Sequence, residues 1–186
     1  MQDVLRRLQL ALPRVREWII ALHAQHRQSA VPVARLGFTR LPGHFPARLL
    51  QTTRSVIVPS TPFPPLAHYG LPEFAPMAAM EMGAITFGDM YFVRADANSE
   101  SLHVHEMVHV VQWGTLGVDQ FLLTYAIGIL EHGYRESLLE AIAYDSAARF
   151  DSGVLPCSGF VEDVANHAVN TRDAAAVTFA RHGLSI

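Results

Sequence analysis

Apolar positions near the start of the chain recur at helical spacing, with Arg and Gln between them. They are Val4, Leu8, Leu12, Val15, Ile19 and Leu22. This spacing predicts a helix that runs to about residue 28 with one apolar face. Pro13 is expected to kink this helix or to start a second one, because proline lacks the amide hydrogen that a helix interior needs. We expect the apolar face to pack into the core; a helix that binds a membrane surface or a partner is the alternative.

The pattern changes after the first helix. Residues 31–60 carry β-type segments, notably residues 52–58, which are rich in β-branched side chains. Residues 60–76 are rich in proline and are predicted to form an irregular loop. Residues 84–94 are predicted to form one strand, or two strands joined at Gly88-Asp89.

Beyond residue 99 the pattern is helical almost throughout. The predicted helices span residues 99–113, 118–132, 135–151 and 159–182. The apolar run 116–130 is short for a membrane span and contains Asp119, so it predicts a buried core helix. Strands first and helices after predict a single α+β domain over residues 1–186, with residues 1–30 as an N-terminal helical extension. We expect a small, mostly antiparallel sheet packed on the helix 99–113.

A five-residue motif, His105-Glu106-Met107-Val108-His109, lies inside the helix predicted over residues 99–113. Residues four apart share one face of a helix, so His105 and His109 can direct two imidazole nitrogens at one point. Two histidines, a third protein ligand and one open position make a catalytic zinc site. Glu106 would then be close enough to the attacking water to accept its proton.

The third ligand must come from elsewhere in the chain. Glu140 is the strongest candidate, because it lies in an otherwise apolar helical stretch where a carboxylate is costly to bury unless it is paired or bound to a metal. A solvated helix position is the alternative for Glu140. Four other residues remain open as the ligand: Glu131, His132, Glu136 and Asp145. His103 is about 200° round the helix from His105, so we expect a cap or core residue there.

Other polar and aromatic residues near the motif have less defined roles. A hydrolytic site needs a hydrogen-bond donor for the developing oxyanion. Four residues are candidates for that donor: Tyr134, Tyr144, His132 and Arg135. Trp113, Phe121 and Tyr125 are expected to lie in the core. The segment 84–93, as an edge strand, could pair with an extended peptide.

Composition excludes several function classes. The fourteen cationic residues are all Arg, so neither a Schiff-base lysine nor a phosphate-loop lysine exists here. The net charge of -3 gives no electrostatic argument for nucleic acid. Cys157 is the only cysteine, which excludes an intramolecular disulfide and a multi-cysteine zinc site, and we interpret it as incidental. The first residues lack the pattern of a signal peptide, so we expect a cytoplasmic protein.

Three stretches together carry a family resemblance. His105-Glu-x-x-His109-Val-Val-Gln112, preceded by Ala-Ile-Thr86-Phe-Gly and followed by Leu-Glu140-x-x-Ala-Tyr144, resembles the small gluzincin-type zinc metallopeptidases of the DUF4157 kind. The resemblance covers about residues 80–150. It implies a zincin-like fold with a minimal thermolysin-like core. By similarity, His105, His109 and Glu140 would be the zinc ligands and Glu106 the general base.

The sequence departs from the thermolysin-like pattern at one position. An Asp often follows the ligand Glu by four residues in those enzymes and braces a histidine ligand. Here Tyr144 occupies that place and Asp145 comes next. The sequence therefore leaves open which residue supports the metal ligands from behind.

The sequence as a whole predicts a zinc-dependent metallopeptidase that acts on a peptide or protein substrate. The alternative is a non-proteolytic binding or scaffold module that keeps the zincin fold. Glu106 favours the peptidase, because a structural metal site needs ligands but no base. No nucleic-acid partner and no membrane span are expected, and the oligomeric state stays open.

Overall fold

The computed structural model describes residues 1–154 and 158–186, so the interpretation of Cys157 lies outside the described residues. Its strands are β1 (Val31–Pro32), β2 (Arg54–Val58), β3 (Ala84–Phe87) and β4 (Met90–Arg94), in the order β1-β2-β4-β3. The β1–β2 and β3–β4 pairings are antiparallel, whereas β2 and β4 are parallel. The α+β class is confirmed, with a mixed sheet, because the chain between β2 and β4 crosses over rather than turning back directly.

The segment 84–94 forms two strands, β3 and β4, joined at Gly88-Asp89 as one of the two alternatives predicted. Gly88 has φ +67°, a conformation that other L-residues rarely adopt. β4 is the inner strand, and its residues 90–93 are at most 6% exposed. This burial on both faces explains the unbroken apolar run in its sequence. β3 is left as an edge strand.

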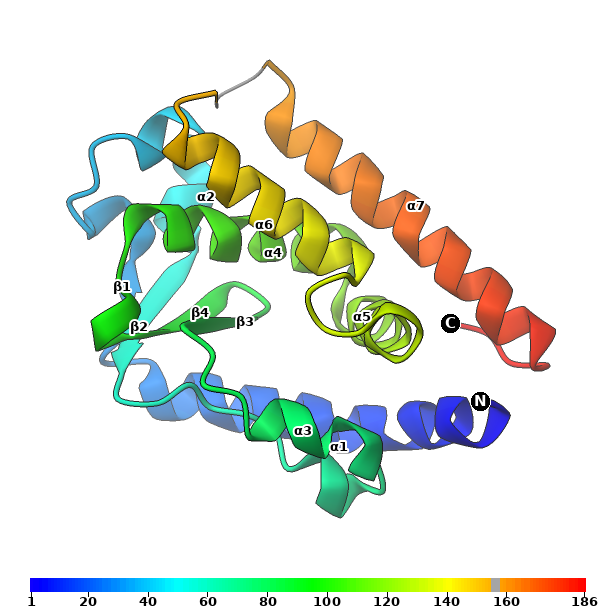
Figure 1. Ribbon diagram of the computed structural model, residues 1–186. Coiled ribbons are helices and arrows are strands. Elements are labelled where there is room, and N and C mark those ends of the chain that lie inside the picture. Colours follow the sequence, from blue (N-terminus) through cyan, green and yellow to red (C-terminus); the bar gives the residue numbers. More distant parts are fainter. Residues whose placement is uncertain (155–157) are drawn as a thin grey trace.

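Helix α1 (Gln2–His26) is continuous through Pro13, so no second helix starts there. Pro13 lies on the exposed side of α1, where water can satisfy the carbonyl that loses its helical hydrogen bond. The apolar side of α1 packs on one face of the sheet, where the rings of Trp18 and Phe87 lie 5.1 Å apart. Figure 1 shows α1 along one face of the sheet and α4 along the other.

Short helices replace much of the predicted loop and of the predicted β region. Between β1 and β2 lie η1 (Val33–Arg35), η2 (Leu41–Gly43) and α2 (Ala47–Thr52). Residues 60–76, predicted to be irregular, contain η3 (Leu66–Tyr69) and η4 (Pro72–Phe74) and lead into α3 (Ala75–Ala78). Pro72 and Pro76 stand at helix starts, where proline loses no hydrogen bond. After β4 comes η5 (Ala95–Ala97).

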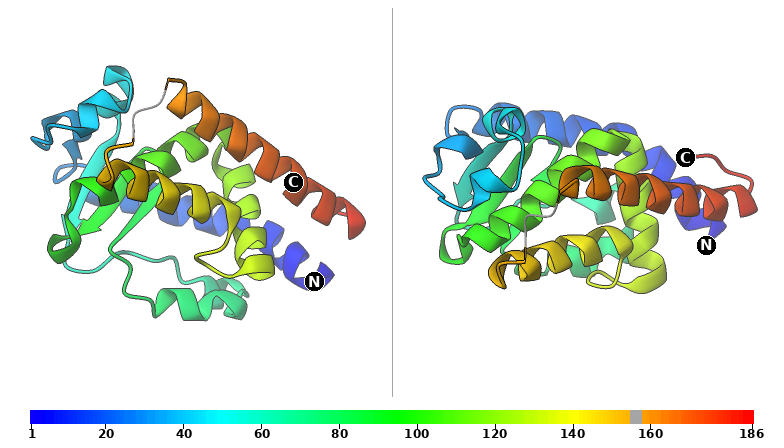
Figure 2. Two further views of the ribbon diagram at one scale, coloured as in Figure 1. Left: turned by 45° about the horizontal axis from the view of Figure 1, so that its top comes forward. Right: turned by 90° about the horizontal axis from the view of Figure 1, so that it is seen from above.

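The predicted C-terminal helices are present with small shifts at their ends. They are α4 (Glu100–Leu116), α5 (Val118–His132), α6 (Leu138–Asp151) and α7 (Phe160–Arg181). Ser99 caps α4, its hydroxyl accepting from the amide of Leu102 at 3.3 Å. α4 lies between the sheet on one side and α6 and α7 on the other, as both views of Figure 2 show. Because α4 is covered on nearly all sides, even its polar residues His105, Glu106 and His109 are buried.

Helix α5 contains the apolar run that the sequence assigned to the core. Its buried residues include Phe121, Leu123, Ala126 and Ile127. Across residues 1–154 and 158–186, no helix combines the length and the apolar character needed to cross a membrane.

Candidate metal centre

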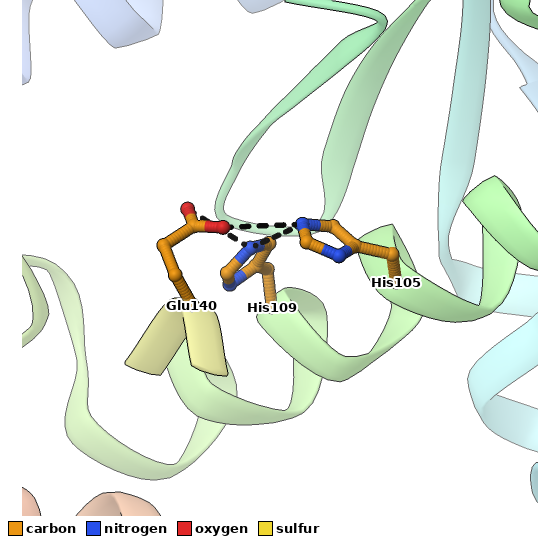
Figure 3. Close-up of side chains that lie close together, drawn as sticks. All are labelled: His105, His109 and Glu140. Atoms are coloured by element: carbon orange, nitrogen blue, oxygen red, sulfur yellow. Dashed lines mark hydrogen bonds and ion pairs between the residues drawn. The ribbon is translucent and has the colours of Figure 1, made fainter. Parts of the chain in front are cut away.

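Helices α4 and α6 bring three metal-ligating side chains together. His105 and His109 lie one turn apart on α4, and Glu140 lies in the first turn of α6 (Figure 3). The Nε2 atoms of the two histidines are 3.1 Å apart. Glu140 places Oε2 at 3.3 Å from His105 Nε2 and Oε1 at 3.4 Å from His109 Nε2. Within the part of the chain that the structure describes, this is the one His, Cys, Asp and Glu group able to hold a metal ion.

These separations fit a tetrahedral ion. Four ligands at about 2.0–2.1 Å from a zinc ion lie roughly 3.3 Å from one another. The two histidine nitrogens are 3.1 Å apart, and each lies 3.3 to 3.4 Å from a different oxygen of Glu140. One ligand atom from each of the three residues lies within 4.8 Å of the others. Glu140 Oε2 is also buried, and it lies 3.3 Å from His105 Nε2. A buried carboxylate needs a positive partner, and a bound cation would supply one. The group can therefore hold a metal ion.

The triad is a charge cluster among buried groups. Burial disfavours a charge on His109, yet the Glu140 carboxylate outweighs burial and raises the pKa of His109 to about 9. Burial likewise opposes the charge on Glu140, but the charge on His109 and the hydrogen bonds of both histidines hold the pKa of Glu140 well below its usual range. A divalent cation bound to the three side chains would replace the protons on the histidines as the positive charge that stabilises the Glu140 carboxylate.

Glu106 lies beside the triad and has its own partner on the sheet. The hydroxyl of Thr86, on β3, donates a hydrogen bond of 2.6 Å to Glu106 Oε2. Burial raises the pKa of Glu106, although the charges on His105 and His109 and the Thr86 hydroxyl oppose the shift. A carboxylate whose pKa is raised is a better proton acceptor. Thr86 therefore holds Oε2 of Glu106, whereas Oε1 makes no hydrogen bond with Thr86.

Gln112, one turn beyond His109 on α4, supports the metal ligands through hydrogen bonds. Gln112 Oε1 accepts from His109 Nδ1 at 2.8 Å, and Gln112 Nε2 donates to the carbonyl of Leu139 at 2.9 Å. Asp145, next to the expected brace position, is instead 3.8 Å from Arg149. Sequence reasoning missed this role, because only folding shows that Gln112 reaches α6.

Tyr125 was predicted to be a core residue, and its ring does pack against Phe121. Its hydroxyl, however, donates a hydrogen bond of 2.5 Å to Glu140 Oε1. Burial, and then the nearby Glu140 charge, raise the pKa of Tyr125, so it keeps its proton. The prediction for Tyr125 was therefore incomplete. No spacing rule links a tyrosine on α5 to a carboxylate on α6, so the sequence offered no signal for this contact.

The other residues left open as third ligand lie elsewhere. Glu131 accepts a hydrogen bond from Thr178, and His132 Nε2 is 3.8 Å from Glu131. Glu136 is exposed just before α6, and Asp145 points to Arg149. Of these candidates and Glu140, the structure brings Glu140 alone to the two histidines.

The four candidate oxyanion donors are also separated by the fold. Tyr134 lines the same cavity as the triad. The ring of Tyr144 lies 4.6 Å from that of His105, and the guanidinium of Arg135 stacks over the Tyr144 ring. His132 lines a second, smaller cavity next to α5. Burial, followed by the charge of Glu140, raises the pKa of Tyr134, so its hydroxyl stays a donor.

His103 is a core histidine, one of the two alternatives predicted. Tyr91 Oη lies 2.7 Å from its Nδ1, and Asn98 Oδ1 lies 2.7 Å from its Nε2. Burial lowers the pKa of His103 to about 4, so the ring is neutral near pH 7. Both ring nitrogens are occupied, and His103 takes no part in the triad.

An apolar cavity of about 110 Å³ adjoins the triad. Its walls come from α1, the segment 63–82, β3, α4 and α5. His105, Glu106, His109 and Glu140 supply the imidazole and carboxylate groups of its lining, and Thr86, Tyr125 and Tyr134 supply hydroxyl groups. The metal-binding group therefore faces a space that a ligand can enter.

Comparison of the chain with protein-family models, with curated proteins and with solved structures finds no match.

Proposed function

We propose that this protein is a zinc-dependent hydrolase of peptide bonds, with His105, His109 and Glu140 as the zinc ligands. The observation that carries the proposal is the combination of this triad with Glu106. Two histidines and one glutamate are a donor set of catalytic zinc sites, with a fourth position free for water. Glu106 is not needed to hold the metal, yet it is buried beside the triad and oriented by Thr86.

Zinc, when bound, acidifies water and polarises a carbonyl group. Glu106 accepts a proton from the attacking water and later delivers it to the leaving amine. The raised pKa of Glu106 suits both halves of this proton transfer. Thr86 holds the carboxylate through the cycle with its 2.6 Å hydrogen bond.

The oxyanion of the tetrahedral intermediate needs a hydrogen-bond donor. We assign this role to Tyr134, because its side chain lines the cavity of the triad and remains protonated. Tyr125 is already committed to Glu140. Tyr144 packs against His105 and shares a hydrogen bond with Tyr134, but it is not part of the cavity lining.

The substrate peptide would lie along β3. β3 is the edge strand of the sheet, and Thr86, which holds Glu106, belongs to it. An extended peptide can pair with the free backbone groups of such an edge. The scissile carbonyl would then pass beside Glu106 and the triad.

The test combines metal content with hydrolysis. His109→Ala and Glu140→Ala should each lose zinc, measured by elemental analysis of purified protein. Glu106→Gln keeps the size of the side chain but not its basicity. It should retain zinc and lose hydrolysis by about 10²-fold or more, measured on a peptide that the wild type is found to cleave in a library read by mass spectrometry. The exposed Glu136→Gln is the matched control and should behave as wild type.

Two results would contradict the proposal. Full zinc content in both His109→Ala and Glu140→Ala would remove the metal assignment. Wild-type turnover by Glu106→Gln would remove the mechanism. Zinc uptake without cleavage of any library peptide would instead favour the non-proteolytic binding module.

A further inference from the structure

Charge is divided unevenly along the chain. Residues 1–54 hold nine of the fourteen Arg and only two of the seventeen acidic residues, Asp3 and Glu17. No Asp or Glu occurs between Glu17 and Glu73. Five arginines lie in this stretch: Arg27, Arg35, Arg40, Arg48 and Arg54. The net charge of -3 is therefore the sum of a basic N-terminal part and an acidic remainder.

The fold gathers the arginines of residues 27–54, the basic segment, at one end of the molecule. β1 pairs with the start of β2, where Arg54 lies opposite Pro32. α2 carries Arg48 and packs on β1 and on η1, which ends at Arg35. β1 and β3 are the two outer strands of the sheet, so the basic segment lies at the opposite edge from the strand that adjoins the metal centre (Figure 1).

The arginines of the basic segment lack acidic partners. Arg27, Arg35 and Arg48 are exposed, and within the part of the chain that the structure describes they take part in no ion pair. Arg40 and Arg54 donate to backbone carbonyl groups. A guanidinium presents its N–H donors in a fixed fork that matches a carboxylate. The basic segment therefore presents positive charge that no side chain of this protein neutralises, in a form that suits carboxylates.

Exposed apolar side chains accompany the arginines. Val31 is 40% exposed and Ile57, just beyond the basic segment, is 50% exposed. Both lie on one face of the sheet, because Val31 pairs with Ser55 and Ile57 is two residues further along β2. Arg beside exposed apolar side chains is a combination typical of protein–protein interfaces.

The rest of the molecule limits the kind of partner. Residues 55–186 hold fifteen of the seventeen acidic residues and five of the fourteen Arg. A membrane or a nucleic-acid duplex extends well beyond the basic segment and would meet this acidic remainder, since charges interact over about 10 Å at 0.1 M salt. An acidic peptide segment is small enough to stay on the basic segment, and it can offer apolar side chains as well as carboxylates.

We propose that the basic segment binds an acidic segment of a partner protein, whose carboxylates pair with Arg35 and Arg48 and whose apolar side chains contact Val31 and Ile57. This interaction does not depend on the proposed function. Because the basic segment lies at the opposite edge of the sheet from β3, a partner bound there leaves the metal centre uncovered.

The test measures binding of a fluorescent peptide to the full chain by anisotropy. The peptide repeats Glu-Glu-Val over about 12 residues, and a control peptide has Gln in place of every Glu. The acidic peptide should bind and the Gln peptide should not. Raising the salt from about 0.05 M to about 0.5 M should weaken binding by about 10-fold or more, because exposed charges are screened.

Arginine variants locate the binding surface. Arg35→Gln combined with Arg48→Gln should weaken binding of the acidic peptide by about 10-fold, the combined effect of two exposed ion pairs. Arg6→Gln combined with Arg181→Gln is the matched control, because it removes the same charge from two exposed positions elsewhere. This control should bind the peptide nearly as wild type does. Melting curves check that each variant folds.

A further variant tests the apolar contact. Val31→Thr keeps the branched shape that suits a strand and removes one methyl group, so it should weaken binding about fourfold. Val177→Thr is the control, because Val177 is 50% exposed on α7. Equal binding by Val31→Thr and wild type would overturn the apolar part of the proposal.

Three other results would overturn the proposal as a whole. Equal binding of the Glu and Gln peptides would remove the role of charge. Equal losses in the two arginine pairs would show that the basic segment is not the site. Tighter binding of an RNA oligonucleotide or of phosphatidylglycerol vesicles than of the peptide, lost in Arg35→Gln with Arg48→Gln, would assign the surface to a nucleic acid or a membrane instead.

Discussion

The two carboxylate oxygens of Glu140 have different partners. Oε1 accepts a hydrogen bond from Tyr125, whereas Oε2 is buried and lies 3.3 Å from His105 Nε2. His109 is held from behind by Gln112, so its Nε2 faces Glu140. At the scale of single residues, Tyr125 and Gln112 orient the metal ligands through hydrogen bonds, although neither side chain belongs to the ligand set.

Tyr125→Phe removes the hydrogen bond to Glu140 and little else. We expect the zinc affinity to fall about 10-fold, because partners behind the ligands typically contribute 10–100-fold. Competition with a chromogenic chelator measures the change. Tyr69→Phe is the control, because Tyr69 lies on η3 and contacts Arg14 instead. Equal zinc affinity in Tyr125→Phe and wild type would show that the contact does not support the ligand.

At the scale of elements, the site depends on how α4 and α6 meet. Gln112 is fully buried between them and bonds the ligand His109 on one side and the Leu139 carbonyl on the other. Leu139 directly precedes Glu140. One side chain therefore sets the position of two ligands that belong to different helices.

Gln112→Leu keeps a similar volume and deletes both hydrogen bonds. His109 Nδ1 then loses its buried acceptor and the Leu139 carbonyl loses the Gln112 donor, which should lower the free energy of unfolding by about 2 kcal/mol. Urea unfolding of the metal-free protein measures this loss, and zinc affinity should fall as well. Gln51→Leu, on the exposed surface of α2, should change stability by less than about 0.5 kcal/mol. The same small change in Gln112→Leu would refute the bridging role.

At the scale of the whole molecule, α1 joins parts of the chain that are far apart in sequence. It covers one face of the sheet and walls the cavity beside the triad. Arg7 ties α1 to the segment 66–78, donating to Glu73 Oε1 at 2.5 Å and to the Gly70 carbonyl. This contact holds the segment over the cavity.

Arg7→Gln should loosen the segment 66–78 and lower the melting temperature at low salt. The effect should shrink as salt is added, because exposed charges are screened. Arg7 also lowers the pKa of Glu73 from 4.5. The contribution of the pair is therefore present above pH 4.5 and lost as the pH falls below it, and Arg7→Gln should lack this pH dependence.

Hydrogen exchange of residues 66–78 provides a direct measurement of this loosening. Arg6→Gln is the matched control, since Arg6 is exposed on the neighbouring position of α1. Faster exchange in Arg7→Gln alone is the expected result. Identical exchange in both variants would mean that apolar packing, not Arg7, holds the segment.

Periodicity predicted the long elements well and the short ones poorly. The helices after residue 99 and the two strands around Gly88 follow from local patterns of apolar residues and from a turn glycine. The one-turn helices in residues 60–78 do not, because each is too short to be stable by its own sequence; η3 packs against α1 and η4, and α3 packs against η4. The parallel pairing of β2 with β4 could not be predicted either, because the residues of a strand do not show whether the connection to its neighbour crosses over.

The sequence by itself determined the pair His105 and His109, because one turn of a helix fixes their relation wherever the helix packs. It favoured Glu140 through the burial cost of a carboxylate, while its rivals stayed open. Tertiary structure decided the remainder: the approach of Glu140, the braces Gln112 and Tyr125, and the cavity walled by α1. Each of these contacts joins separate elements, and their meeting is set by the packing of the whole core rather than by local spacing.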